Sequence, residues 1–518
     1  MRRLPTLFRG CLQVSLLSPL AYLAWLSIRR DGTFSLEAYS RSLEPGVWPV
    51  LARTIAIGSA STFLALALGG PAAWALERRC FPLKPFLRTA ALFSLVLPPF
   101  FHVAVWEYLA LPGGVLTKLF PWAVAPGRPF PIRSAFFTTL VLGTSFSPVF
   151  FFFISQGLRT IPRELVDAAR VSRGPGVVAW RIIVPLLLPA IAAASGMVFT
   201  FSLLAYEVPR LLDVTTYSVL VQVSYGAQDD PGLAFAALLP LFLTGAMVLL
   251  AFESWASRRG FALSGREARE TLVATERAGL LPWCVFGGWW AFSTALPIWV
   301  LCVLAGRRSV FANAWLTDWE KVLWGVCVSS LSALLAVAVA AALLLPPLAQ
   351  GRRRFAHLWL PLALPGSLLG FTLIRWFQIG PFYALYNSPA VLVVAGAMRF
   401  FPVAVLALEA HLRSSPRDEW SAAKLAPGRA RRWLRIRLPL AAPGLEAGSV
   451  AVALLCACEL PATLLLAPPG SEPVIVRIYN LVHYTPERNV LAALCLFQAL
   501  GTILGAVCLV TVLKIFRR

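Results

Sequence analysis

Long apolar runs separated by short charged segments dominate this 518-residue chain. A helix needs about 20 apolar residues to cross a bilayer, because the hydrocarbon core is about 30 Å thick and a helix rises about 1.5 Å per residue. Twelve runs reach that length, at about 10–28, 54–76, 89–111, 134–158, 182–206, 232–252, 281–305, 322–347, 355–377, 390–412, 438–464 and 491–513. The pattern predicts an all-α polytopic membrane protein with about twelve transmembrane helices.

Composition excludes a soluble globular protein. Residues AVILMFWYC make up 58% of the chain and DEKR only 14%, whereas about 25% of a soluble domain is charged. The formal net charge of +22 would suit a nucleic-acid-binding protein, but 34 Phe and 18 Trp leave little polar chain for a basic domain. We therefore expect a lipid bilayer around the chain and no nucleic acid as a partner.

The distribution of basic residues predicts the orientation of the chain. Cytoplasmic segments of membrane proteins are enriched in Lys and Arg. With the N-terminus inside, 31 of the 46 Lys and Arg fall in cytoplasmic segments and 13 in outer loops. The first run lacks a small-residue cleavage site and closes with Arg29-Arg30, so we interpret it as an uncleaved anchor. Both termini are therefore predicted to be cytoplasmic.

The chain contains an internal repeat displaced by 254 residues. The segment 158–189 matches 412–443 without a gap, including an L-R-x-x-P-R-[ED] start, an Ala-Ala pair and a P-L-x-x-P end. We therefore predict two halves of six spans each, residues 1–265 and 266–518. Since six is even, both halves have the same orientation and the repeat is parallel, about an axis along the membrane normal.

Each copy of the matched segment predicts a short helix in a cytoplasmic loop, at 159–181 and 413–437. Pro162 and Pro416 suit a first helical position, and Gly174 and Gly428 suit the stop. A helix of about three turns with small residues on one face would allow another protein to dock closely. A basic amphipathic loop that only maintains topology is the alternative, and the second copy in the same register favours docking.

At these residues the chain resembles the transmembrane permease subunits of binding-protein-dependent ABC importers. Their cytoplasmic signature, Glu-Ala-Ala, Gly and Ile-x-Leu-Pro, forms the coupling helix that sits in a cleft of the ATPase. In this chain Ser421 replaces the acid, and the Ala-to-Pro spacing is one residue short in both halves. The coupling positions that the resemblance implies are Glu164, Asp167, Ala168, Ala169, Gly174 and Pro185 in the first half and Asp418, Ser421, Ala422, Ala423, Gly428 and Pro439 in the second.

The resemblance extends to the fused two-half permeases of ferric-iron uptake. Residues 97–100 (LPPF) and 364–367 (LPGS) resemble the paired Leu-Pro sites of that branch, and 459–466 (ELPATLLL) resembles its second-half segment. It implies a pathway for ferric iron in a bacterial inner membrane, two copies of an ABC ATPase subunit and a periplasmic substrate-binding protein. Thiamine, polyamine or another small solute on the same architecture stays an alternative.

No residue pattern for catalysis or metal binding stands out. The chain has no G-x-x-x-x-G-K-[ST], since none of its five lysines follows Gly. We therefore expect no enzyme activity and no cofactor on this chain, with ATP and Mg bound by partner subunits. The nine cysteines and four histidines show no metal-ligand spacing, so we predict no metal site.

Charges inside predicted spans are functional candidates, because an ionisable group is costly at membrane depth. We take Glu459, Pro98 and Pro365 as pathway candidates, since helices broken near Pro can line a pathway. Arg399 is expected to pair with a carboxylate of a neighbouring helix. Two other classes are weighed: a proton-coupled secondary carrier would need no matched cytoplasmic helices, and a membrane enzyme would cluster Asp, Glu and His at one interface.

Overall fold

The structure is a computed structural model, and it describes residues 18, 21–22, 24–25, 27–30, 33–42, 44–124, 127–172, 174–226, 231–258, 278–345, 356–378, 383–414, 428, 432–484 and 487–515. These residues are almost entirely helical. A two-stranded antiparallel pair, β1 (Arg29–Arg30) and β2 (Thr33–Phe34), is the sheet within them.

Nine helical segments within the described residues are long and apolar enough to cross a membrane. They are Val47–Arg78, Ala135–Arg159, Gly176–Leu204, Phe235–Phe252, Leu280–Ala305, Arg308–Leu344, Ala390–Leu412, Arg435–Ala457 and Arg488–Lys514. They confirm the predicted all-α polytopic membrane fold. The predicted count of twelve is not confirmed, because the first predicted span falls largely outside the described residues and others are interrupted.

The longer helices carry these spans. Their bounds are α3 (Val47–Arg78), α7 (Ala135–Arg159), α10 (Val184–Leu204), α13 (Pro231–Arg258), α14 (Leu280–Trp290), α15 (Leu296–Ala305), α16 (Arg308–Leu344), α19 (Ala390–Ser414), α22 (Leu438–Ala457) and α25 (Arg488–Ile515). The shorter helices are α2 (Glu37–Ser42), α6 (Val115–Leu119), η2 (Pro121–Ala123), α8 (Arg163–Ser172), α9 (Pro175–Val178), α11 (Glu207–Leu211), α12 (Tyr217–Gly226), α18 (Tyr383–Tyr386), α23 (Pro461–Leu466) and α24 (Val474–Tyr484).

The third and ninth predicted spans are interrupted at a Leu-Pro pair. In the first half, α4 (Lys84–Leu92) and η1 (Phe93–Val96) meet α5 (Pro99–Leu109) at 84°. In the second, η5 (Ala356–Ala363) is separated from α17 (Gly366–Phe377) by Leu364-Pro365. Proline lacks an N–H and disfavours helix in the residue before it, so a continuous helix does not form at either place.

The fifth and eleventh predicted spans end early, also at equivalent positions. Helix α10 stops at Leu204 and α11 starts at Glu207, while α22 stops at Ala457 and α23 starts at Pro461. Each half therefore combines long helices with two breaks.

Two π turns recur at the 254-residue spacing. They are η3 (Ala179–Ile183) and η8 (Trp433–Arg437), in which Val184 and Leu438 donate their N–H groups to carbonyls five residues back. Pro185 and Pro439 follow directly. A proline ring clashes with the carbonyl four residues earlier in an α-helix, and the wider π turn relieves that clash. The turn η4 (Ala291–Ala295) precedes Pro297 in the same way.

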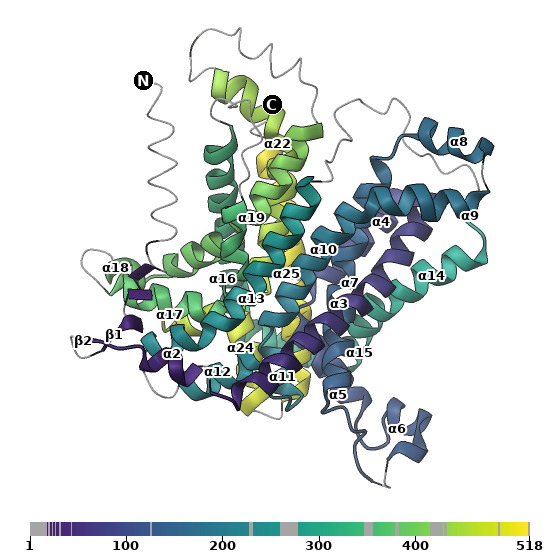
Figure 1. Cartoon of the computed structure of the whole chain (residues 1–518). Helices are drawn as coiled ribbons and strands as arrows, with labels where there is room; N and C mark the ends of the chain where they lie inside the picture. The colour runs from purple at the N-terminus through teal and green to yellow at the C-terminus, as the bar shows by residue number, and fades with distance from the viewer. Residues whose placement is uncertain are drawn as a thin grey trace. The chain divides into compact units, whose positions relative to one another are not determined.

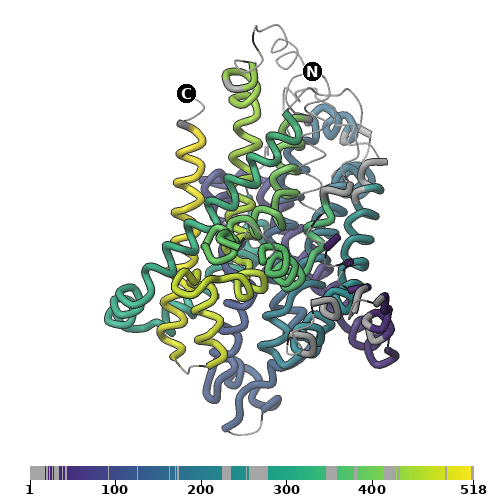
Figure 2. The backbone as a smooth tube through the Cα atoms, turned by 90° about the vertical axis from the view of Figure 1, so that its left-hand side faces the viewer, coloured from purple at the N-terminus to yellow at the C-terminus, as the bar shows by residue number. Residues whose placement is uncertain are grey.

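The chain forms two compact units that alternate along the sequence. Unit 1 contains Met1–Trp48, Leu220–Ala246 and Arg307–Arg518, and unit 2 contains Pro49–Val219 and Met247–Gly306. In unit 1, α16 packs against α19, α22 and α25, and α22 also packs against α19 and α25; α25 is the last, yellow helix of the tube in Figure 2. In unit 2, α7 packs against α10 and α5 (Figure 1). The predicted halves, 1–265 and 266–518, are defined by the sequence repeat and differ from these two compact units. The boundary at residue 265 stays a prediction.

Candidate functional site

The first predicted coupling loop contains a helix. Helix α8 covers ten residues, Arg163–Ser172, which is about three turns and confirms the predicted helix. It lies at the end of unit 2 where α7 stops, opposite the end that carries α6 (Figure 1). Glu164 in its first turn is favourable, because the N-terminus of a helix attracts negative charge.

One side of α8 is anchored and the other is exposed. Val166 is fully buried, as is Ile161 just before the helix. On the opposite side Leu165, Ala168 and Val171 are exposed, and Val171 is 90% exposed. Their spacing of three residues places them along one stripe of the helix. We call these three residues the α8 face, an exposed and largely apolar surface.

Sequence reasoning missed part of this surface. It singled out the small residue Ala168 but passed over Leu165, Val171 and the exposed Trp180 of η3. The pattern that could have found them is an apolar stripe at helical spacing within an otherwise basic loop.

The structure places the predicted coupling residues as follows. Within the first loop, Glu164, Asp167, Ala168 and Gly174 are exposed, Ala169 is half-buried, and Pro185 is exposed at the start of α10. In the second loop, Gly428 is exposed with φ of 82°, a left-handed conformation that favours glycine at a helix end. Pro439 is half-buried in α22. Asp418, Ser421, Ala422 and Ala423 lie outside the described residues.

The break between α22 and α23 contains a buried ion pair. Arg399 of α19 donates from its guanidinium to Oε1 of Glu459, and the two residues are only 6% and 9% exposed. The same oxygen accepts the backbone N–H of Ala462 at 3.2 Å, so Glu459 caps the start of α23. The predicted pairing of Arg399 with a carboxylate of a neighbouring helix is confirmed.

Gly366 makes room for this pair. A Cβ atom at Gly366 would collide with Oε1 of Glu459 and the guanidinium of Arg399, and would lie 3.1 Å from Cβ of Pro461. The buried Pro365 stands directly before it. Two of the three predicted pathway residues, Glu459 and Pro365, therefore lie at one place in unit 1, whereas buried Pro98 forms the corresponding break in unit 2.

A second buried carboxylate in unit 1 escaped sequence analysis. Asp318 precedes the predicted span 322–347, but α16 begins at Arg308 and Asp318 is 1% exposed. Lys321 Nζ lies 2.5 Å from its Oδ1, and Arg477 Nε of α24 lies 3.6 Å from the same atom. The i, i+3 spacing of Asp318 and Lys321 was the available indication.

The buried acids described above face cations of the chain itself. Within the described residues, no group of three or more His, Cys, Asp and Glu is arranged to hold a metal ion. The Arg399–Glu459 ion pair can stabilise the interrupted helices of unit 1. The α8 face can serve as a docking surface in unit 2.

Known transport proteins resemble the chain, one of them over most of its length and others over parts of it. The Fe(3+)-transport system permease protein FbpB 2 of Haemophilus influenzae is 24% identical over 467 residues, which are 85% of this chain and 86% of that protein. The trehalose transport system permease protein SugA of Mycobacterium tuberculosis is 29% identical over 34% of this chain and 60% of its own length. Profiles of protein families give no match.

A third relative carries the family assignment. The molybdenum transport system permease protein ModB of Mycobacterium bovis is 31% identical over 216 residues, which are 40% of this chain and 78% of that protein. It therefore matches a stretch shorter than half of the chain, as a single-half permease would, whereas FbpB 2 matches most of the chain. With its apolar helices and interrupted spans, the chain belongs to the transmembrane permease subunits of ABC importers.

Proposed function

We propose that this permease subunit conducts ferric iron across the bacterial inner membrane, after delivery by a periplasmic binding protein. The proposal of ferric iron as the substrate rests on the match to the ferric-iron permease, which covers 85% of this chain and 86% of that protein. The matches to the molybdenum and trehalose permeases cover 40% and 34% of the chain. Thiamine, polyamine and other small solutes stay the alternatives on the same architecture.

Permeases of this family work with ATPase and substrate-binding partners. We propose that two ATPase subunits dock, one on each coupling loop, and that both chain termini lie on that cytoplasmic side. The α8 face supports docking, because exposed apolar area gains about 25 cal/mol per Å² when a partner covers it and Val171 is 90% exposed. ATP and Mg bind to those subunits, and the permease performs no covalent chemistry.

We propose that the breaks in the interrupted helices line the transport pathway. Non-helical backbone at membrane depth is tolerated where protein buries it or where it lines a cavity, and discontinuous helices commonly form substrate sites in transporters. Pro98, Pro365 and Glu459 stand at such breaks. When the ATPase subunits close on ATP, the coupling loops would carry the motion to these breaks and so alternate access between the two sides.

Copurification tests the docking step. The purified chain should retain two ATPase copies, and Val171→Asp should reduce retention at least about tenfold, because a carboxylate would have to be desolvated at the interface. Trp122→Ser is the matched control, since Trp122 is 82% exposed but belongs to η2, at the other end of unit 2. Equal retention of ATPase by the Val171 variant and the control would refute docking on the α8 face.

Transport into vesicles tests the cargo. Proteoliposomes holding the complex should accumulate ferric ion in an ATP-dependent manner when its binding protein is present, and molybdate or thiamine should not compete. Uptake of ferric ion by the chain alone, driven by a proton gradient, would instead support a secondary carrier. ATP-dependent uptake of another solute in place of iron would refute ferric iron as the substrate. The assignment to the ABC importers would still hold.

A further inference from the structure

A buried carboxylate at the end of α3 joins three helices of unit 2. Glu77, one residue before α3 ends, is 5% exposed. Arg88 of α4 donates to both of its oxygens, from Nε to Oε1 at 2.8 Å and from a terminal nitrogen to Oε2 at 2.5 Å. Ser155 of α7 donates its hydroxyl to Oε1 at 2.6 Å. Such a bidentate, charge-assisted arrangement fixes geometry more strongly than a single hydrogen bond.

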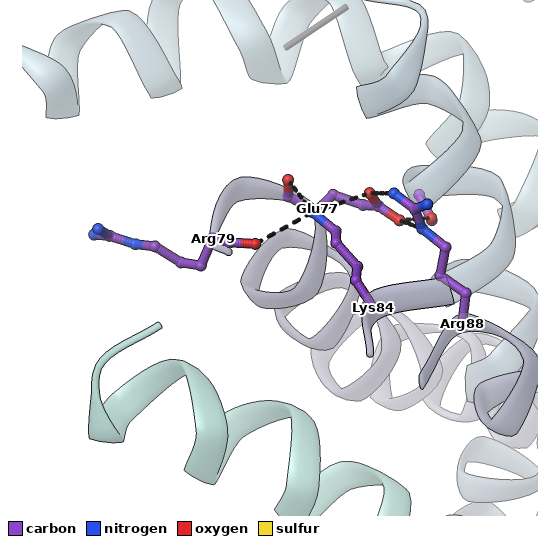
Figure 3. A network of polar contacts seen from close by, with 5 residues as sticks. Glu77, Arg79, Lys84 and Arg88 are labelled. Atoms are coloured by element: carbon purple, nitrogen blue, oxygen red, sulfur yellow. Dashed lines mark hydrogen bonds and ion pairs between the residues drawn. The ribbon is translucent and has the colours of Figure 1, made fainter. Parts of the chain in front are cut away.

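A lysine fixes the turn that follows. Lys84 Nζ donates to the backbone carbonyls of Glu77 at 2.9 Å and of Arg79 at 3.2 Å, and lies 3.6 Å from Oε2 of Glu77. The last carbonyls of a helix lack partners within the helix, and a cation there is favourable. Figure 3 shows Lys84 and Arg88 directed at Glu77, whereas the side chain of Arg79 points away. The end of α3 and the start of α4 are thus held together.

This cluster adjoins the first coupling loop. From Ser155, helix α7 continues for one turn to Arg159, where the loop begins. Ile161 and Val166 in that loop are fully buried, so its first turns are attached to the body of unit 2. A displacement of α8 therefore reaches the last turn of α7, where Ser155 contacts Glu77.

The other side of the cluster leads to a helix break. Helix α4 continues through η1 to Leu97-Pro98, the break at 84°. The end of α4 is held to α14, since Trp290 donates its indole N–H to the carbonyl of Ala90 at 3.0 Å. Rotation of α4 would consequently change the position of η1 and Pro98.

We propose that Glu77 is a positioning residue that transmits motion from the first coupling loop to the Pro98 break. Its bonds to Ser155 and Arg88 make α4 follow the last turn of α7. The inference rests on the proposed function, because it assumes that an ATPase moves α8. It adds a route for that motion, through a carboxylate that is buried within unit 2.

Two variants cut the route at different bonds. Ser155→Ala removes the bond between α7 and α3 and leaves the Glu77–Arg88 ion pair intact, and Glu77→Gln removes the ion pair. Thr89→Ala is the control, because Thr89 is an exposed neighbour of Arg88 whose hydroxyl donates to the carbonyl of Pro85 within α4. All three are purified as complexes with the ATPase, using ferric ion on its binding protein as the transported probe.

Uncoupling is the expected result. Amide hydrogen exchange of residues 84–92 should respond to a non-hydrolysable ATP analogue in the wild-type and Thr89→Ala complexes, and this response should be lost in the other two variants. ATP consumed per ferric ion should rise at least about tenfold in Glu77→Gln, the factor that loss of a hydrogen bond to a charged group can supply.

Other outcomes overturn the proposal. It fails if residues 84–92 do not respond to nucleotide in the wild type, or still respond fully in Ser155→Ala and Glu77→Gln. It also fails if transport and ATP hydrolysis fall in the same proportion, because a purely structural role would lower both together. If the wild-type chain does not copurify with the ATPase, the proposed function fails first, which is a distinct result.

Discussion

The two halves of the protein form the same helix breaks with different chemistry. In the second half, Arg399 and Glu459 pair inside the break and Gly366 leaves room for them. The positions 254 residues before the pair are Ser145 and Ala205, which carry no charge. The residue after Leu97-Pro98 is Pro99, where the second half has Gly366. The ion pair and the glycine that leaves room for it thus occur in the second half, and none of the three residues is found at the corresponding position of the first half.

The difference shows that the break itself does not require an ion pair. In unit 2, α5 packs against α7 and α11, as α17 packs against α19 and α23 in unit 1, without a buried charge at those positions. A buried ion pair seldom adds net stability, because desolvation offsets the attraction. The pair is therefore a specific property of the second half, consistent with a role for Glu459 in the proposed pathway.

Breaking the pair should have the largest effect. Glu459→Ala or Arg399→Ala leaves one charge buried and unpaired, which typically costs about 3–5 kcal/mol. We expect loss of folded protein and of transport, measured by unfolding in mixed detergent micelles and by uptake into proteoliposomes. Ala205→Ser at the equivalent position of the first half is the control and should be nearly silent.

A double substitution separates stability from transport. Arg399→Gln with Glu459→Gln leaves two amides that can hydrogen-bond, so stability should recover by more than half. Transport should stay low if the carboxylate belongs to the pathway. Full recovery of both would show that the pair only holds the helices, and the first half would then be the better place to search for cargo contacts.

Crowding the pair should have an intermediate effect. Gly366→Ala places a Cβ atom against the guanidinium and the carboxylate, and overpacking of this kind costs about 1–3 kcal/mol. Pro99→Ala is the matched change in the first half and should cost less, because Pro99 already carries a Cβ atom. Equal losses of unfolding free energy in the two variants would contradict the difference between the breaks.

Patterns among residues close in sequence predict much of the fold but few of the ion pairs. Hydropathy located the apolar helices, and capping residues located α8, because both depend on neighbours in sequence. The Leu-Pro pairs were recognised, but the 84° bend after η1 was not. The π turns also escaped prediction, although Pro185 and Pro439 account for them physically.

Contacts between residues far apart in sequence determine which charged side chains are buried and paired. The sequence predicts that Arg399 pairs with a carboxylate, but only packing selects Glu459, which is 60 residues away in the break between α22 and α23. Glu77 and Asp318 lay just outside predicted spans, where charges usually face water. In the fold both are buried, because helices α4, α7 and α24 bring cations or hydroxyls to them. The separation in sequence, up to 159 residues between Asp318 and Arg477, hides such partners.

The smallest expected effect concerns Ser145, which replaces Arg399 in the first half. Its hydroxyl is buried and has no hydrogen-bond partner among the described residues. A buried polar group without a partner costs about 1–3 kcal/mol, so Ser145→Ala should leave the unfolding free energy unchanged or raise it by up to about 1 kcal/mol. Unfolding in mixed micelles measures this shift. A marked loss of transport without loss of stability would mean that the hydroxyl contacts the cargo, and the uncharged break would then share the function proposed for the charged one.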